Sequence, residues 1–168
     1  YNFDLIEKTL FGYESITIQS PRELQRRVLK SGKAEGPLWG GNMCLLVNRL
    51  GTADQLNTSG TILFIEDIDE YLYAFDRMMV HMKEAGMFQN ITGLIIGELV
   101  DMKDQDIPFG KSTDEIVMDV CSDLDIPIIS NFPCGHGVFQ STLPISIPVQ
   151  LDAKSNSSTL TLLESPVK

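Results

Sequence analysis

Short runs of apolar residues, each bounded by turn-forming residues, recur along the chain in the pattern of buried β-strands. Three such runs cover residues 61–68, 91–99 and 126–130. The segments between them have helical patterns: an amphipathic stripe stops at Gly86, and a capping box at residues 112–115 begins a helix to about Leu124. The stripe consists of Leu72, Phe75, Met79 and Met82. Strands that alternate with helices predict an α/β fold with a mostly parallel central sheet and flanking helices.

The first 37 residues carry weaker patterns. Apolar spacing predicts a short helix over residues 1–12, and alternation predicts a strand over residues 15–18. Residues 20–30 begin with Ser-Pro-Arg-Glu, which supplies an N-cap, a proline at the first helical position and a capping glutamate. We therefore expect a helix to Lys30, followed by a turn-rich connection over residues 31–37, which contain Gly and Pro.

The last quarter of the chain has a different pattern. Residues 143–151 and 158–163 alternate like strands, and a polar segment at residues 152–157 separates them. This arrangement predicts a C-terminal β-hairpin, and its prolines predict a position at the edge of the sheet.

A Gly-Gly-Asn sequence precedes a short apolar helix that stops at Gly51. Asn42 is expected to be the N-cap of this helix. Gly40 and Gly41 would leave backbone N–H groups near the helix N-terminus open to a carboxylate or another anion. We therefore name Trp39, Gly40, Gly41 and Asn42 as candidate substrate-binding residues. The alternative is that the two glycines form only a tight turn and that Trp39 is a core residue.

Composition narrows the class of protein. A chain of 168 residues fits one domain with a sizeable core. The net charge of −10 and the lack of a dense Lys and Arg cluster argue against a nucleic-acid partner, and no apolar run approaches the about 20 residues of a membrane helix. Three cysteines without a C-x-x-C pair argue against a disulfide framework and a zinc site, and they fit a reducing cytoplasm. We expect neither a metal nor another cofactor.

Two carboxylates, Glu66 and Asp67, stand at the exit of the first apolar strand. A strand end is rigid while the loop after it is open to a ligand, so reactive groups often lie there. Asp67, Asp69 and Glu70 also fall at the positive end of the helix that follows, where carboxylates are stabilised. That electrostatic role would account for all of them without any chemistry, and we assign it to Asp67.

His136 lies between two glycines directly after the third strand, whereas His81 falls on the polar side of the long helix and is expected at the surface. In a parallel sheet the exits of the strands share one edge, so Glu66 and His136 can meet there. A carboxylate bound to one ring nitrogen of an imidazole leaves the other nitrogen as a general base. The sequence contains no Gly-x-Ser-x-Gly nucleophile, and Cys134 stays open as a candidate although it is very close to His136.

Several motifs together resemble the C-terminal domain of the LD-carboxypeptidase family. They are Trp-Gly-Gly-Asn-Met at residues 39–43, Leu-Gly-Thr at 50–52, Ile-Leu-Phe-Ile-Glu-Asp-Ile at 62–68, Tyr-Ala-Phe-Asp-Arg-Met-Met at 73–79, Gly-Leu-Ile-Ile-Gly at 93–97, Phe-Pro-Cys-Gly-His-Gly at 132–137, and Leu-Pro at 143–144. The resemblance makes the whole of residues 1–168 one C-terminal domain, with residues 1–35 leading into it and residues 36–152 carrying the motifs. It implies a swivelling β/α/β-type domain.

The resemblance also implies a function. The family comprises serine peptidases with a Ser-Glu-His triad, whose serine lies in an N-terminal domain. Glu66 and His136 match the Glu and His of the triad, and this chain would lack the nucleophile and be inactive alone. The implied enzyme is a cytoplasmic, homodimeric carboxypeptidase that removes a terminal D-amino acid from murein peptides during peptidoglycan recycling.

Two alternatives remain at this point. One is an immunity-type peptidase that cleaves a peptide-nucleotide antibiotic of the microcin C kind, for which Trp39 is the only tryptophan available to stack on a base. The other is a non-catalytic binding or dimerisation module; the presence of both Glu66 and His136 counts against it.

Overall fold

The computed structural model describes residues 2–11, 16–154 and 157–167, which form four helices and eight strands. The strands form one sheet in the order β1 (Thr17–Gln19), β8 (Ser157–Leu162), β7 (Pro148–Lys154), β3 (Gly32–Asn42), β4 (Ile62–Ile68), β5 (Gly93–Val100), β6 (Ile128–Gly135) and β2 (Arg27–Lys30). The helices are α1 (Asn2–Phe11), α2 (Met43–Asn48), α3 (Leu72–Glu84) and α4 (Thr113–Cys121). None of the helices in this described part combines the length and apolarity needed to span a bilayer.

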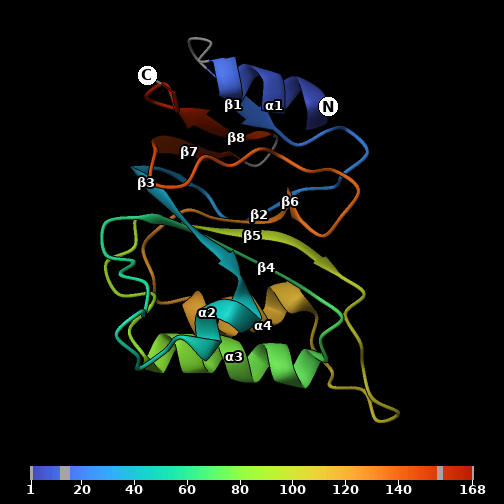
Figure 1. Cartoon of the computed structure of the whole chain (residues 1–168). Helices are drawn as coiled ribbons and strands as arrows, with labels where there is room; N and C mark the ends of the chain where they lie inside the picture. Colours follow the sequence, from blue (N-terminus) through green and yellow to red (C-terminus); the bar gives the residue numbers. More distant parts are fainter. Residues whose placement is uncertain (1, 12–15, 155–156, 168) are drawn as a thin grey trace.

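The centre of the sheet is parallel, as predicted. Strands β3, β4, β5 and β6 pair in parallel, and the pairings toward both edges are antiparallel. Strand β3 joins two halves of the sheet, because its first part pairs with β7 and its last part pairs with β4. Figure 1 shows α2, α3 and α4 on one face of the parallel strands, and β1, β7, β8 and then α1 on the other side.

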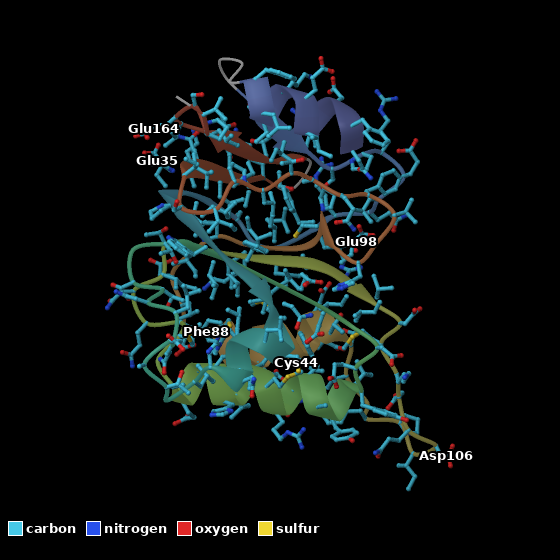
Figure 2. All side chains as sticks on the ribbon, viewed as in Figure 1. Glu35, Cys44, Phe88, Glu98, Asp106 and Glu164 are labelled. Carbon is cyan, nitrogen blue, oxygen red and sulfur yellow. The ribbon has the colours of Figure 1, made fainter. Side chains whose placement is uncertain are left out.

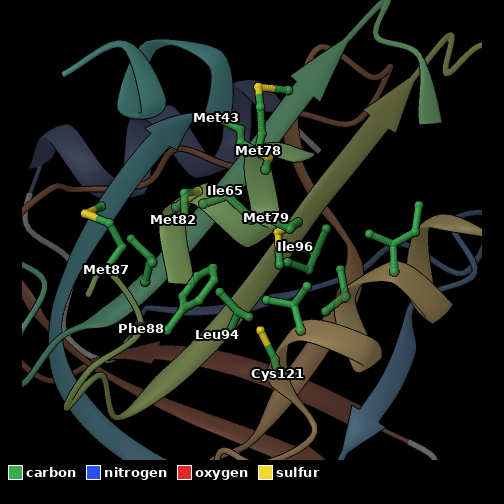
Figure 3. Close-up of a cluster of buried hydrophobic side chains, with 14 of the residues drawn as sticks. Met43, Ile65, Met78, Met79, Met82, Met87, Phe88, Leu94, Ile96 and Cys121 are labelled. Atoms are coloured by element: carbon green, nitrogen blue, oxygen red, sulfur yellow. The ribbon is translucent and has the colours of Figure 1, made fainter. Parts of the chain in front are cut away.

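Two apolar cores result from this arrangement, one on each face of the parallel strands. Alternation along β4 sends Leu63 and Ile65 into the core beside the helices, and Ile62 and Phe64 into the core beside β7 and β8. Methionines fill much of the helix-side core (Figure 3): Met43, Met78, Met79, Met82 and Met87. The predicted stripe on α3 is therefore core, with Phe75, Met79 and Met82 fully buried and Leu72 packed against them.

Several local predictions are confirmed. Ser112 and Glu115 form a capping box at the start of α4, and Asn42 caps α2 by accepting a hydrogen bond from the Leu45 backbone N–H group. The predicted C-terminal hairpin is present as β7 and β8, but β7 begins at Pro148 and includes residues 152–154, which were predicted to belong to the turn. Strand β6 continues beyond the predicted run to Gly135.

Three predictions about the flanks are wrong. Residues 20–30 do not form a helix: Leu24 bonds back to Pro21 in a turn, and the end of the segment is β2, which pairs with β6. Residues 31–37 are not a loop, because they form the first part of β3 against β7. The hairpin is not at the edge, since β7 pairs with β3 on one side and β1 pairs with β8 on the other. In each case pairing with a distant strand overrides the local signal.

The predicted N-terminal helix is present as α1, whereas its predicted end at Gly12 lies outside the described residues. Its apolar positions Phe3 and Leu10 are exposed, and Leu5 and Thr9 are its buried residues. The strand predicted over residues 15–18 is present as β1, which begins at Thr17 and ends one residue later than predicted, and residue 15 also lies outside the described part.

Candidate active site

Glu66 lies at the carboxyl end of β4 with only 7% of its surface exposed. Because side chains alternate along a strand, Glu66 follows Phe64 to the face of the sheet away from α2, α3 and α4. Its neighbour Asp67 points to the opposite face, toward the start of α2. The two adjacent carboxylates therefore have different surroundings.

His136 is the first residue after β6, and it meets Glu66 as predicted from the shared strand edge. Its Nδ1 atom lies 2.7 Å from Oε2 of Glu66. An ionised carboxylate can only accept hydrogen bonds, so with Glu66 ionised this contact requires a proton on Nδ1. The His136 side chain is 47% exposed, compared with 9% for Glu66. This geometry presents Nε2 as the nitrogen that can take a proton from a reactant.

Two glycines lie so close to Glu66 that a side chain would not fit there, and one of them also has a backbone conformation that favours glycine. Gly135 has a φ of +111°, and a Cβ atom there would lie 2.7 Å from Oε2 of Glu66, the atom that binds His136. On β5, a Cβ atom at Gly97 would come within 2.9 Å of Cβ of Glu66. Side chains at these two positions would displace Glu66 from the imidazole.

Asp67 is a helix-end carboxylate, but at a different helix from the one predicted. Its Oδ2 accepts from the backbone N–H group of Cys44 in the first turn of α2 at 3.1 Å, and its Oδ1 accepts from Nδ2 of Asn42 at 3.0 Å. Oδ1 also accepts from the backbone N–H group of Ile68 at 2.9 Å. The assignment to α3 is therefore wrong: alternation along β4 sends Asp67 to the face that carries the helices, and the helix that starts against its carboxylate there is α2.

The four candidate substrate-binding residues lie together at the end of β3. Gly40 and Gly41 belong to the strand and pair with Phe64 and Ile65, so they are not a tight turn. A Cβ atom at Gly40 would lie 1.8 Å from the carbonyl oxygen of Phe64, which explains the glycine by close approach of strands. Asn42 stands beside Glu66 in the register.

Trp39 is half-buried. The anion at the N-terminus of α2 is the carboxylate of Asp67, which accepts directly from Cys44 of the helix and also from the side chain of Asn42. A role in substrate binding for this segment stays a prediction.

The sequence matches a family model for the C-terminal domain of LD-carboxypeptidases over residues 35–151. The chain belongs to this family. Two relatives illustrate the range of names within it. A probable murein peptide carboxypeptidase of Bacillus subtilis is 32% identical over 130 residues, which are 77% of this chain and 40% of that protein. The microcin C7 self-immunity protein MccF of Escherichia coli is 29% identical over 174 residues, 96% of this chain and 48% of that protein.

Solved structures agree with this LD-carboxypeptidase assignment. A muramoyltetrapeptide carboxypeptidase from Oxalobacter formigenes superposes with a TM-score of 0.83 at 27% identity, covering 95% of this chain and 53% of the other. MccF in its apo state superposes with a TM-score of 0.86 at 20% identity, which shows the shared fold, over 99% of this chain and 55% of the other. The chain thus spans about half the length of the proteins it matches.

Glu98 of this LD-carboxypeptidase domain is a third carboxylate at the site that the sequence reading missed. It lies near the end of β5, and the backbone N–H group of Phe139 donates a hydrogen bond to its carboxyl group. Burial raises the pKa of Glu98, and the bond from Phe139 opposes the shift. The available signal was its place at the exit of the strand next to Glu66, at the same sheet edge.

Cys134 is a poor candidate for the nucleophile. It is almost fully buried, and burial together with the nearby Glu66 and Glu98 raises the pKa of its thiol far above the usual range. A thiol acts as a nucleophile through its thiolate, which this environment disfavours. Among the described residues, moreover, no group of three His, Cys, Asp or Glu side chains has the arrangement of a metal site.

Proposed function

We propose that this chain is the C-terminal part of a serine peptidase that removes a terminal D-amino acid from murein peptides. Glu66 and His136 supply two members of its Ser-Glu-His triad. The observation that carries the proposal is the 2.7 Å contact between Nδ1 of His136 and Oε2 of Glu66 at the carboxyl edge of the parallel strands. The names of the relatives, murein peptide and muramoyltetrapeptide carboxypeptidases, support the substrate class.

In the proposed mechanism Glu66 acts through His136. Its carboxylate accepts the Nδ1 proton, which keeps the imidazole in one tautomer and stabilises the imidazolium that forms. Nε2 removes the proton from a serine hydroxyl group as the serine attacks the scissile carbonyl, and it then gives that proton to the leaving amine. The serine and the oxyanion-hole donors belong to an N-terminal domain of the same enzyme. This chain alone is therefore inactive, because a general base without a nucleophile has nothing to activate.

In this proposal Trp39, Gly40, Gly41 and Asn42 line the substrate cleft, and the pairing of Asn42 with Glu66 in the sheet supports that role. The remaining parts of the proposal follow from the family resemblance. The enzyme is a cytoplasmic homodimer with a role in peptidoglycan recycling, and it uses no metal or other cofactor.

A second candidate substrate is a peptide-nucleotide antibiotic. It is favoured by the match to MccF, which covers nearly the whole chain, and by a related structure of MccF in complex with glutamyl sulfamoyl guanosine. Both substrates require the same Glu66 and His136 chemistry and differ only in what the cleft accepts. A comparison of turnover on the two classes decides between them.

The test uses the complete enzyme that contains this chain, with a murein tetrapeptide that ends in D-Ala as the substrate. His136→Ala is expected to lower kcat on the order of 10⁴-fold or more, because the general base is lost. His81→Ala is the matched control, since His81 lies exposed on α3, and it should leave turnover unchanged. Equal turnover of the His136→Ala variant and the unaltered enzyme would exclude the triad assignment and leave a non-catalytic module as the better interpretation.

A further inference from the structure

Glu98 occupies a position on the sheet that faces the loop carrying His136. Ile96 and Leu99 both contact the helix-side core although they are three residues apart, so β5 does not alternate regularly between them. The register between β5 and β6 shifts at Gly97 and Glu98. Such irregularities redirect side chains and occur frequently near active sites. Figure 2 shows Glu98 on the side of the sheet away from α2, α3 and α4.

The carboxyl group of Glu98 lies directly against the backbone of Gly137. A Cβ atom at this position would come within 2.1 Å of the carboxyl carbon of Glu98 and 2.2 Å of both carboxyl oxygens. A side chain at position 137 would therefore require the carboxyl group of Glu98 to move from its present place. Gly135 has the same relation to Glu66, where a Cβ atom would lie 2.7 Å from Oε2. Each of the two glycines that flank His136 therefore packs against one carboxyl group: Gly135 against Glu66, and Gly137 against Glu98.

A hydrogen bond strengthens this contact, because Phe139, two residues further along, donates its backbone N–H group to Glu98. The next part of the loop is held by α1: Asn2 donates to the carbonyl oxygen of Val138 at 3.3 Å and accepts from the backbone N–H group of Gln140 at 2.8 Å. Within the loop, Gln140 donates from Nε2 to the carbonyl oxygen of Gly137 at 2.7 Å. Glu98 is the residue of β5 that contacts this loop, at Gly137 and at Phe139.

One carboxyl oxygen of Glu98, Oε1, takes no part in the mechanism proposed above. Oε1 is buried and has no hydrogen-bond partner among the described residues. Leaving a buried polar atom unsatisfied destabilises the folded state, so a group of this kind needs an explanation. Packing against Gly137 supplies one, because the carboxyl group must be buried in order to support that backbone.

We propose that Glu98 is a positioning residue of this site: its carboxyl group supports the backbone of Gly137 and Phe139, so that Nδ1 of His136 stays within hydrogen-bond distance of Glu66. The consequence of this positioning role for catalysis rests on the function proposed above. Glu98 acts through the loop, by its contacts with Gly137 and Phe139.

The first experiment uses NMR on the ¹⁵N-labelled chain to determine which nitrogen of the His136 imidazole carries the proton. Two-bond ¹H–¹⁵N correlations report the tautomer of His136 at a pH where the ring is neutral, and exposed His81 is an internal reference. The unaltered chain and Glu98→Gln, which keeps the size and the acceptor, should show the Nδ1-protonated tautomer. Glu98→Ala should lose it in favour of the Nε2-protonated form. Glu164→Ala, at an exposed position far from the site, should change nothing.

A second variant disturbs the same contact from the other side. Gly137→Ala places a Cβ atom on the carboxyl group of Glu98, so it should also shift the tautomer of His136 while the rest of the spectrum stays native. Adding Glu98→Ala to Gly137→Ala removes the clash, so the two effects on the free energy of unfolding should not be additive. Additive effects, or an unchanged tautomer in both folded single variants, would overturn the proposal.

In the complete enzyme, Glu98→Ala should lower kcat on the order of 100-fold with little change in KM, and Glu98→Gln should restore turnover. A purely structural role would reduce the amount of folded enzyme and leave the kcat of the folded fraction unchanged. If His136→Ala keeps full turnover, the proposed function fails, whereas the tautomer measurement still decides the role of Glu98.

Discussion

Asp67→Asn tests whether the carboxylate of Asp67 stabilises the start of α2. Asp67 is 2% exposed, and its two oxygens accept from Asn42, Cys44 and Ile68. Asn42 cannot turn its amide to suit the variant, because its own oxygen accepts from Leu45 to cap α2. An asparagine at position 67 must therefore direct its NH₂ group at another N–H donor.

The expected cost follows from these contacts. A hydrogen bond to a charged group contributes about 1.5–3 kcal/mol, and a carboxylate at a helix N-terminus adds about 0.3–1 kcal/mol. Asp67→Asn keeps one acceptor oxygen, so we expect it to lose one such bond together with the charge. The predicted decrease in the free energy of unfolding is about 2–4 kcal/mol, a large part of the about 5–15 kcal/mol typical of a domain.

Urea unfolding followed by circular dichroism measures this decrease. With a slope of about 2 kcal/mol per molar urea, the midpoint should fall by about 1–2 M. Asp69→Asn removes the same charge two residues away and is the matched control. Asp69 is exposed, has a φ of +64° that asparagine tolerates, and pairs with Lys103 at the surface, so its cost should be below about 1 kcal/mol. Equal losses in the two variants would refute the assignment of Asp67 to α2.

The three thiols should differ in reactivity: Cys44 is exposed, whereas Cys121 and Cys134 are buried, and burial raises the pKa of Cys121 to about 12. In the folded chain a thiol reagent should modify Cys44 alone, and slowly, since burial and Asp67 also raise its pKa; fast modification of a second thiol would contradict the structure. The raised pKa of Glu98 means that the folded chain holds this proton more tightly than the unfolded chain does. Its contribution to stability is therefore complete below the unfolded pKa and is lost as the pH rises through the folded pKa. Urea unfolding from about pH 4 to 8 should show this loss for the unaltered chain and not for Glu98→Gln, and identical profiles would show that Glu98 is not the group responsible.

Local sequence patterns predicted those helices and strands whose signal lies entirely within the element itself. The apolar run of β4, the stripe of α3 and the capping box at Ser112 are each complete within one element, so the printed order of residues is enough to find them. Residues 20–30 show where such signals fail. A good capping sequence is present, but the unpaired edge of β6 offers backbone hydrogen bonds to Arg27–Lys30, and a local pattern contains no information about that edge.

The candidate site divides in the same way. Glu66 and His136 could be predicted from the sequence, because parallel strands bring their carboxyl ends to one edge whatever the details of packing. The place of Glu98 at the same sheet edge could be predicted as well, but its direction could not, because that depends on a register shift between β5 and β6 and on the backbone of a distant loop.

The sequence by itself determined that adjacent carboxylates would leave β4 on opposite faces, because side chains alternate along any strand. It also determined which glycines flank His136. Only the tertiary structure decided what each face meets: the start of α2 lies against Asp67, and the loop after β6 lies against Glu66 and Glu98. The physical reason is that alternation is a property of one strand, whereas a partner depends on where distant segments of the chain pack.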